Sequence, residues 1–262
     1  MVRGYVETRW GQTHYREAPP PDDAAPTLVL VHESPVSSAE FERALPPLGL
    51  ALRVVAFDIP GYGLSDPPPT PREIPQYAEA LIEAAQALGL RRFTVGGLHT
   101  GASIALQMAL QAPSAVTHAV FVGIPLIGRR ARAQLLESWA PPMELAADGS
   151  HFDTIWQRYA SQRSMPPDFL TLLEASLFTV HERYNWAYNA AFRYDPAPDL
   201  PRLRVPVLFV NSEADVLIAA DRRAVEMVPD GRLIAVPGET HPLPWQVPER
   251  FAEAVIDFVR PS

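Results

Sequence analysis

A histidine stands at the position where the sequence predicts a tight turn between a strand and a helix. The stretch Gly97-Leu98-His99-Thr100-Gly101 follows a short apolar run and precedes a run of small and apolar residues. Small residues flank His99 because a strained turn leaves little room for neighbouring Cβ atoms. A turn of this kind lifts its central side chain above a sheet, where enzymes place an attacking group. An imidazole there is compatible with a nucleophile, a general base or a site that has lost its reaction.

An acid and a second histidine follow later in the chain. Asp215 comes after the apolar run 205–211, and His241 comes after the apolar run 232–236. The order of apex residue, acid and histidine is one of the known orders of a catalytic triad. The sequence therefore predicts that His99, Asp215 and His241 meet in one site.

The elements that must position these residues alternate between strands and helices. Apolar runs predict buried strands at 27–32, 52–58, 92–96, 119–123, 205–211 and 232–236. Helical patterns cover about 77–88 and 102–110, and an amphipathic helix closes the chain. Residues 5–18 predict a hairpin that turns around Gly11-Gln12. This alternation indicates an α/β fold with a parallel sheet between helices.

Four stretches of the chain resemble the α/β-hydrolase superfamily. Residues 32–38 resemble its His-Gly-x-Pro loop, and residues 58–66 resemble its Asp-x-Pro-Gly-x-Gly-x-Ser loop. The turn at 97–101 and the pair of segments around Asp215 and His241 complete the match. The resemblance extends over nearly the whole chain and is greatest to the capped branch, which holds haloalkane dehalogenases, epoxide hydrolases and small esterases.

The resemblance implies a fold and a division of the chain. We expect a mostly parallel, eight-stranded sheet flanked by helices, formed by residues 1–124 and 204–262. Residues 125–203 are expected to form a helical cap, because the strand pattern stops there and aromatic helical segments replace it. Within this segment we expect Trp156 and Trp186 to line the substrate pocket together with Glu33.

The resemblance also implies roles for individual residues. Asp215 would fix the ring of His241, and His241 would face the residue at the turn, His99. Backbone N–H groups of Ser34 and Thr100 would form an oxyanion hole.

The sequence departs from the family pattern at two positions. Glu33 replaces the usual glycine of the oxyanion loop, so a carboxylate that could tighten or reshape the hole lies where negative charge develops. His99 replaces the nucleophile, and without a carboxylate at that position we discount dehalogenation and epoxide opening. Thr100 and Ser103 are poor substitutes, because Thr100 would shift the turn and Ser103 faces the core.

These residues leave several reactions open. The N-terminus of the following helix should keep the His99 ring neutral, so that it could attack a carbonyl carbon or act as a base. Our first hypothesis is hydrolysis of a small apolar ester, lactone or other carbonyl compound through His99, Asp215 and His241. The alternatives are a non-hydrolytic enzyme of the lyase, decarboxylase or cofactor-free oxygenase type, and a non-catalytic small-molecule binding protein.

Composition excludes several other classes of function. The chain has 262 residues, of which 47% are apolar, which suits one domain with an insertion or at most two small domains. It has no lysine and no cysteine, so Schiff bases, Walker-type phosphate loops, thiolate metal sites and disulfides are excluded. A net charge of −8 argues against nucleic-acid binding.

Other features of the chain carry weaker expectations. We see no metal motif, and we expect neither a metal nor a cofactor. We also expect no membrane partner, and we expect the protein to be a monomer or a homodimer. The absence of an apolar signal segment near the start favours a cytoplasmic protein. We expect Asp58 and Asp66 to form turns. Sequence spacing gives no partner residue for four other histidines, His14, His118, His151 and His181.

Overall fold

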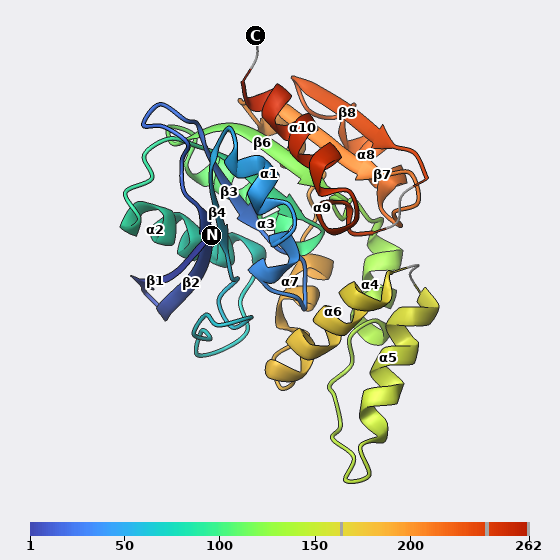
Figure 1. Cartoon of the computed structure of the whole chain (residues 1–262). Coiled ribbons are helices and arrows are strands. Elements are labelled where there is room, and N and C mark those ends of the chain that lie inside the picture. The colour runs from blue at the N-terminus through green and yellow to red at the C-terminus, as the bar shows by residue number, and fades with distance from the viewer. Residues whose placement is uncertain (163–164, 239–240, 261–262) are drawn as a thin grey trace.

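The chain folds around one sheet of eight strands (Figure 1). The computed structural model describes residues 1–162, 165–238 and 241–260. The strand order is β1-β2-β4-β3-β5-β6-β7-β8. The pairs β1–β2 and β2–β4 are antiparallel, and all later pairs are parallel. The mostly parallel, eight-stranded sheet predicted from the sequence is therefore confirmed.

The strands and helices lie close to the predicted segments. The strands are β1 (Val2–Thr8), β2 (Gly11–Ala18), β3 (Thr27–Val31), β4 (Arg53–Phe57), β5 (Phe93–Leu98), β6 (Val116–Val122), β7 (Val207–Ser212) and β8 (Gly231–Val236). The helices are η1 (Ser38–Phe41), α1 (Leu45–Gly49), α2 (Ile74–Ala87), α3 (Thr100–Gln111), α4 (Arg129–Ser138), α5 (Ser150–Gln162), α6 (Pro167–Thr179), α7 (Trp186–Arg193), η2 (Leu200–Arg202), α8 (Ile218–Ala224), α9 (Leu243–Gln246) and α10 (Pro248–Val259). None of the helices within the described ranges has the length and apolar character that a membrane span needs.

The N-terminal hairpin turns two residues earlier than predicted. Thr8 pairs with Gly11 and Glu7 pairs with Gln12, so the turn falls at Arg9 and Trp10. Gln12 is held in the strand because its backbone N–H donates to Asp66 Oδ2 at 2.8 Å. The expected turn at Gly11-Gln12 was wrong because this long-range hydrogen bond cannot be read from local turn residues.

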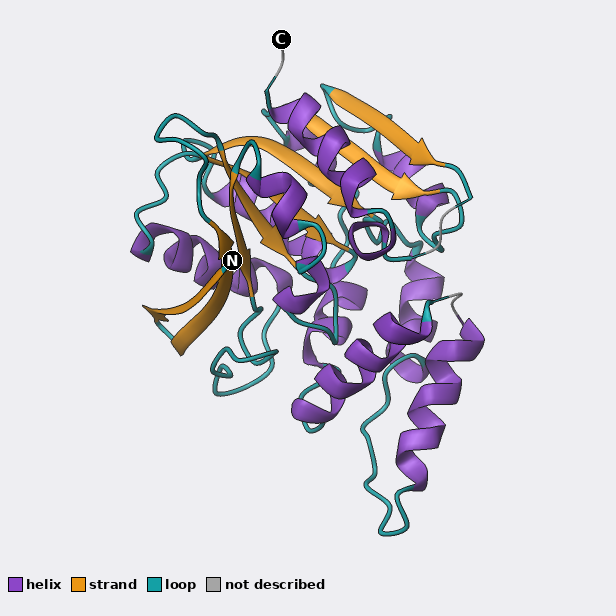
Figure 2. Ribbon diagram, in the orientation of Figure 1, coloured by secondary structure: helices purple, strands orange, loops and turns teal. Residues whose placement is uncertain are grey.

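Helices cover both faces of the sheet (Figure 2). Alternate residues of a strand point to opposite faces, and β3 follows this rule with a fully apolar sequence. Val29 and Val31 belong to the core beneath α2 and α3, whereas Leu28 and Leu30 belong to the core beneath α1 and α10. Burial on both faces explains why the inner strands are continuous apolar runs rather than alternating ones.

The α-helices α4 to α7 and the short 3-10 helix η2 lie between β6 and β7 in the described chain. Figures 1 and 2 show α4, α5 and α6 grouped beside the sheet, on the side to which the arrowheads of the parallel strands point. We call residues 125–203 the helical segment. Buried Tyr62 docks this segment, because its hydroxyl donates to Tyr184 O at 3.0 Å and accepts from Ala187 N at 2.8 Å.

Asp58 organises the loop that carries Tyr62. Its carboxylate accepts hydrogen bonds from the backbone N–H groups of Ser38 at 2.6 Å and Leu64 at 2.9 Å. It also lies 2.8 Å from His14 Nδ1, so His14 has a partner that sequence spacing did not reveal. Burial disfavours the charged carboxylate, but these contacts outweigh burial and lower the pKa of Asp58 to about 2. Asp58 and Asp66 both serve structural roles, as expected.

We predict that Asp58→Asn destabilises the fold by about 3 kcal/mol at pH 7, because it leaves donors facing a neutral side chain. This corresponds to a fall in Tm of about 6–12 °C. The folded pKa lies below the unfolded value of about 3.9, so the stabilisation is present above that value and is lost as the pH falls through about 2. Thermal unfolding followed by circular dichroism at pH 7 and at low pH measures this. Exposed Asp66 provides the control, and equal losses in Asp58→Asn and Asp66→Asn would contradict the assignment.

Candidate active site

Four ionisable side chains meet at the carboxyl edge of the parallel strands. Glu33 follows β3, His99 links β5 to α3, Asp215 follows β7 and His241 follows β8. Ligands and reactive groups in open α/β sheets gather at this edge. The four residues are between 1% and 5% exposed. We call Glu33, His99, Asp215 and His241 the histidine–carboxylate cluster.

His99 occupies the strained turn that the sequence predicts. Its backbone has φ 45° and ψ −107°, and it is the one non-glycine residue with positive φ among those the structure describes. A Cβ at position 101 would lie 2.1 Å from the carbonyl oxygen of Val31. Glycine is required there because α3 begins against the end of β3. This close approach brings His99 beside Glu33.

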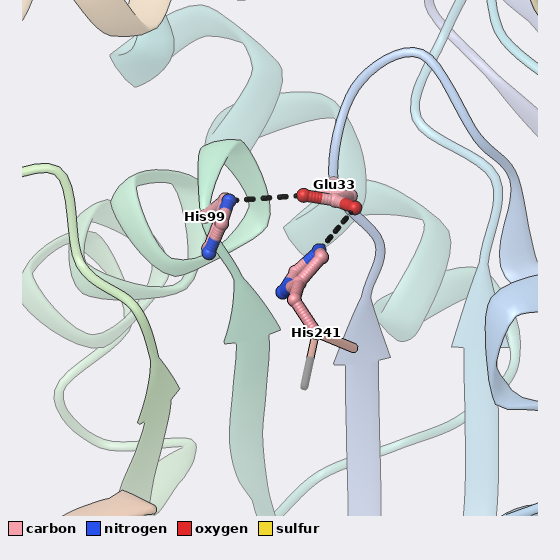
Figure 3. Close-up of side chains that lie close together, drawn as sticks. All are labelled: Glu33, His99 and His241. Carbon is pink, nitrogen blue, oxygen red and sulfur yellow. Dashed lines mark hydrogen bonds and ion pairs between the residues drawn. The ribbon is translucent and has the colours of Figure 1, made fainter. Parts of the chain in front are cut away.

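Each histidine ring lies between the same two carboxylates. His99 Nδ1 is 3.0 Å from Glu33 Oε2, and His99 Nε2 is 3.1 Å from Asp215 Oδ2. His241 Nε2 is 2.6 Å from Glu33 Oε1, and His241 Nδ1 is 2.7 Å from Asp215 Oδ2. Figure 3 shows the Glu33 side of this arrangement, with the carboxylate directed at both rings.

The two rings stack rather than hydrogen bond to each other. Their centroids are 4.4 Å apart and their planes are inclined by 23°. His241 thus faces His99 through its ring plane and not through a ring nitrogen. His99 Nε2 hydrogen bonds to Asp215 and His241 Nε2 hydrogen bonds to Glu33, so the ring faces are left to contact each other. Asp215 Oδ2 lies 2.7 Å from His241 Nδ1 without making a hydrogen bond to it, whereas Asp215 hydrogen bonds to His99 Nε2.

The charged forms of His99, Glu33 and Asp215 stabilise one another. Burial disfavours the imidazolium of His99, but Asp215 and Glu33 outweigh burial and raise its pKa to about 10. Burial also favours the neutral form of each carboxyl, yet the nearby histidines hold the pKa of Glu33 and of Asp215 well below the usual range. The neutral His99 ring expected from the helix N-terminus is wrong, because two carboxylates in contact outweigh a helix dipole.

Two residues that the sequence analysis missed support the cluster. Glu40 is fully buried and accepts the backbone N–H of Glu33 at 3.0 Å. Gly123 follows β6, and a Cβ there would lie 2.4 Å from His99 Cδ2. The backbone N–H of Gly123 donates to Asp221 Oδ2 at 2.9 Å, which fixes this close contact. A glycine at the end of an apolar strand often marks a place where another group lies against the backbone. Gly123 could therefore have been found from the sequence.

A small apolar cavity lies beside His99 and Thr100. Its volume is about 120 Å³, and its remaining walls are Pro125, Ile127, Leu135, Trp139, Tyr188, Ala191, Phe192, Val216 and Leu217. Helix α7 presents Tyr188, Ala191 and Phe192 because residues three and four apart share a helix face. A hollow of about 410 Å³ within the helical segment is larger, but no cluster residue lines it.

Neither expected tryptophan borders the small cavity. Trp186 lines a separate cavity with Met143 and His181, on a different side of α7 from Tyr188. Trp156 on α5 is partly buried against the main core. Ser34 and Thr100, the expected donors of an oxyanion hole, are both buried next to cluster residues in the chain.

Comparisons with known proteins agree on the fold. The sequence profile described as the alpha/beta hydrolase family matches residues 28–254. A protein named putative carbamate hydrolase RutD, from Escherichia coli O7:K1, is 30% identical over 212 residues, which cover 77% of this chain and 78% of that protein. A hydrolase structure from Pseudomonas aeruginosa PA01 has a TM-score of 0.83 at 21% identity and covers 98% of each chain. The enol-lactonase structure from Burkholderia xenovorans LB400 has a TM-score of 0.79 at 20% identity, covering 98% of this chain and 99% of that one.

We predict that Glu33 and His99 are energetically coupled. Glu33→Gln or His99→Gln alone should destabilise the fold by about 3–5 kcal/mol, because each leaves a buried charge without a partner. The double variant should be more stable than the sum of the single effects by about 1–3 kcal/mol. Urea unfolding of the four proteins in the cycle measures this coupling.

A matched cycle on Arg193 and Glu73 provides the control. This pair has side chains that are 39% and 52% exposed, so its coupling should stay below about 1 kcal/mol. Additive effects in both cycles would contradict the charge compensation inferred for the cluster.

Proposed function

Because the chain belongs to the alpha/beta hydrolase family, we propose that it hydrolyses a small, mainly apolar ester, lactone or carbamate at the histidine–carboxylate cluster. The observation that carries this proposal is the position of the cluster. His99 is both a member of the cluster and a wall of the apolar cavity. A substrate whose apolar group fills the cavity would bring its carbonyl carbon next to the charged groups.

We propose that water, rather than a side chain, attacks the carbonyl carbon. Both nitrogens of His99 lie within 3.1 Å of a carboxylate oxygen, so neither lone pair is directed into the cavity. The turn carries no serine, cysteine or aspartate that could take the place of His99. Attack by water would form no acyl-enzyme.

The surroundings suit a small substrate with a developing negative charge. Thr100 is the first residue of α3, and N–H groups at a helix N-terminus lack partners within the helix. We propose that the backbone N–H groups of Thr100 and Ser34 bind the oxyanion. The helical segment would act as a cap, because its side chains Trp139, Tyr188 and Phe192 form one side of the cavity.

The names of the compared proteins fit this substrate class. Carbamates and enol-lactones both present a carbonyl carbon with a heteroatom leaving group. A cavity of about 120 Å³ favours substrates with a short acyl or ring portion.

We predict measurable turnover of short-chain esters, small lactones or carbamates by the wild-type protein. His99→Gln and Asp215→Asn should each lower kcat by about 10²-fold or more, a typical loss for a group that acts on the reacting atoms. Ser103→Ala is the control, because Ser103 is buried in α3 one helical turn beyond His99. Wild-type turnover in both cluster variants, or tight ligand binding with no turnover of any substrate class, would contradict the proposal.

A second prediction tests the attacking group itself. Phosphonylating reagents that trap activated hydroxyl groups should leave the wild-type protein unlabelled. Intact-mass spectrometry should detect a stoichiometric adduct only in His99→Ser, which restores a hydroxyl at the turn. An adduct on Thr100 or Ser103 of the wild type would show that a side chain, not water, attacks the substrate.

A further inference from the structure

We propose that Glu33, His99 and His241 bind one divalent transition-metal ion. Each of them offers one ligand atom, and these atoms lie within 4.8 Å of one another. The facing atoms are His99 Nδ1, His241 Nε2 and the two oxygens of Glu33. Ligand atoms placed around a zinc ion at 2.0–2.2 Å are about 3.3 Å apart. The three side chains thus need only small shifts to surround an ion.

Asp215 lies on the far side of both rings, where metal sites place a supporting carboxylate. It is 3.1 Å from His99 Nε2 and 2.7 Å from His241 Nδ1. At His99, whose Nε2 hydrogen bonds to Asp215, this carboxylate keeps a proton on the far nitrogen, so Nδ1 offers its lone pair to the metal. Asp215 is itself fixed, because its Oδ1 accepts the backbone N–H of Leu217 at 2.7 Å. We therefore assign Asp215 as a positioning residue and not as a ligand.

Charge favours exchange of two protons for one dication. A hydrogen bond of 2.6 Å joins His241 Nε2 to Glu33, and a contact of 3.0 Å joins His99 Nδ1 to Glu33. A nitrogen and a carboxylate oxygen attract each other at these distances only with a proton between them, so we infer one proton in each contact. A dication between the three side chains takes the place of both protons, so the total charge of the cluster is unchanged. Metal binding then releases two protons for each ion bound.

The ligand set selects the kind of ion. Two imidazole nitrogens and one carboxylate suit zinc, cobalt, iron or manganese, whereas calcium and magnesium prefer ligand sets of oxygen alone. Three protein ligands leave a coordination position for water, which a bound metal makes more acidic. A role for this water as the attacking group rests on the proposed hydrolysis. Metal binding itself does not depend on that function.

The experiment is metal binding to chelator-treated full-length protein, with zinc and cobalt chlorides as probes. Titration calorimetry in buffers of different ionisation enthalpy should give one ion per chain and about two protons released. Bound cobalt should show the intense visible absorption of a four- or five-coordinate site. No stoichiometric binding, or binding without proton release, would overturn the inference.

Variants assign the binding to the cluster. Glu33→Gln and His241→Gln should weaken zinc binding by more than 100-fold, and Asp215→Asn should weaken it by about 10- to 100-fold. His151→Ala is the control for histidines outside the cluster and should bind as the wild type does. Circular dichroism identifies any variant that fails to fold, and the binding stoichiometry and cobalt spectrum of the wild type decide the inference without the variants. Binding that survives Glu33→Gln and His241→Gln but is lost in His151→Ala would place the ion elsewhere and overturn it.

Activity separates this inference from the proposed function. Stoichiometric zinc binding with no hydrolysis of esters, lactones or carbamates would support the metal site and contradict the proposed function. Hydrolysis at an undiminished rate by protein shown by mass spectrometry to hold less than one metal ion per ten chains would support the proposed function and contradict a role of the metal in supplying the attacking group. The calorimetric titration alone then decides the metal site.

Discussion

Charge compensation between two histidines and two carboxylates is the constraint on which the site depends. Glu33 and Asp215 are at most 4% exposed, and a buried ion without a partner costs several kcal/mol. The compensation holds only if both rings reach both carboxylates, which requires four separate strand ends to be in register. The parallel order β3-β5-β6-β7-β8 brings these ends to one edge of the sheet. The fold thus allows a charged cluster to be stable although it is buried away from water.

Much of the fold could be predicted because its signals are local. Continuous apolar runs identified the inner strands, and the spacing of Gly97, His99 and Gly101 identified the turn. The hairpin at residues 5–18 was placed two residues late, because the hydrogen bond from Gln12 to Asp66 joins segments far apart in the chain. Long-range contacts of this kind carry no local pattern.

The site could be predicted only in part, for the same reason. Order along the chain indicated that His99, Asp215 and His241 belong together, but it could not show that Glu33 contacts both rings. The charge state of His99 was misjudged because a helix dipole follows from the local sequence, whereas two carboxylates follow from the tertiary structure. Trp156 and Trp186 do not border the small cavity, and this could not be predicted because the sequence of a helix does not fix its rotation against the sheet. The actual cavity contacts, among them Tyr188 and Phe192, depend on how Tyr62 docks the helical segment.

The two departures from the family pattern, Glu33 and His99, depend on each other for charge compensation. Glu33 with a neutral residue at position 99 would leave one carboxylate oxygen without the contact it now has at 3.0 Å. His99 beside a glycine at position 33 would keep a carboxylate at Nε2 alone. A serine mechanism needs a hole free of negative charge, because the tetrahedral intermediate is itself an anion. The Glu33 carboxylate would repel a negatively charged tetrahedral intermediate bound beside it. Such an intermediate is stabilised only if positive charge lies between this carboxylate and the substrate. In the proposed reaction the cluster would supply that charge as protons or as the proposed metal ion, so the chemistry would follow from the cation that the cluster holds.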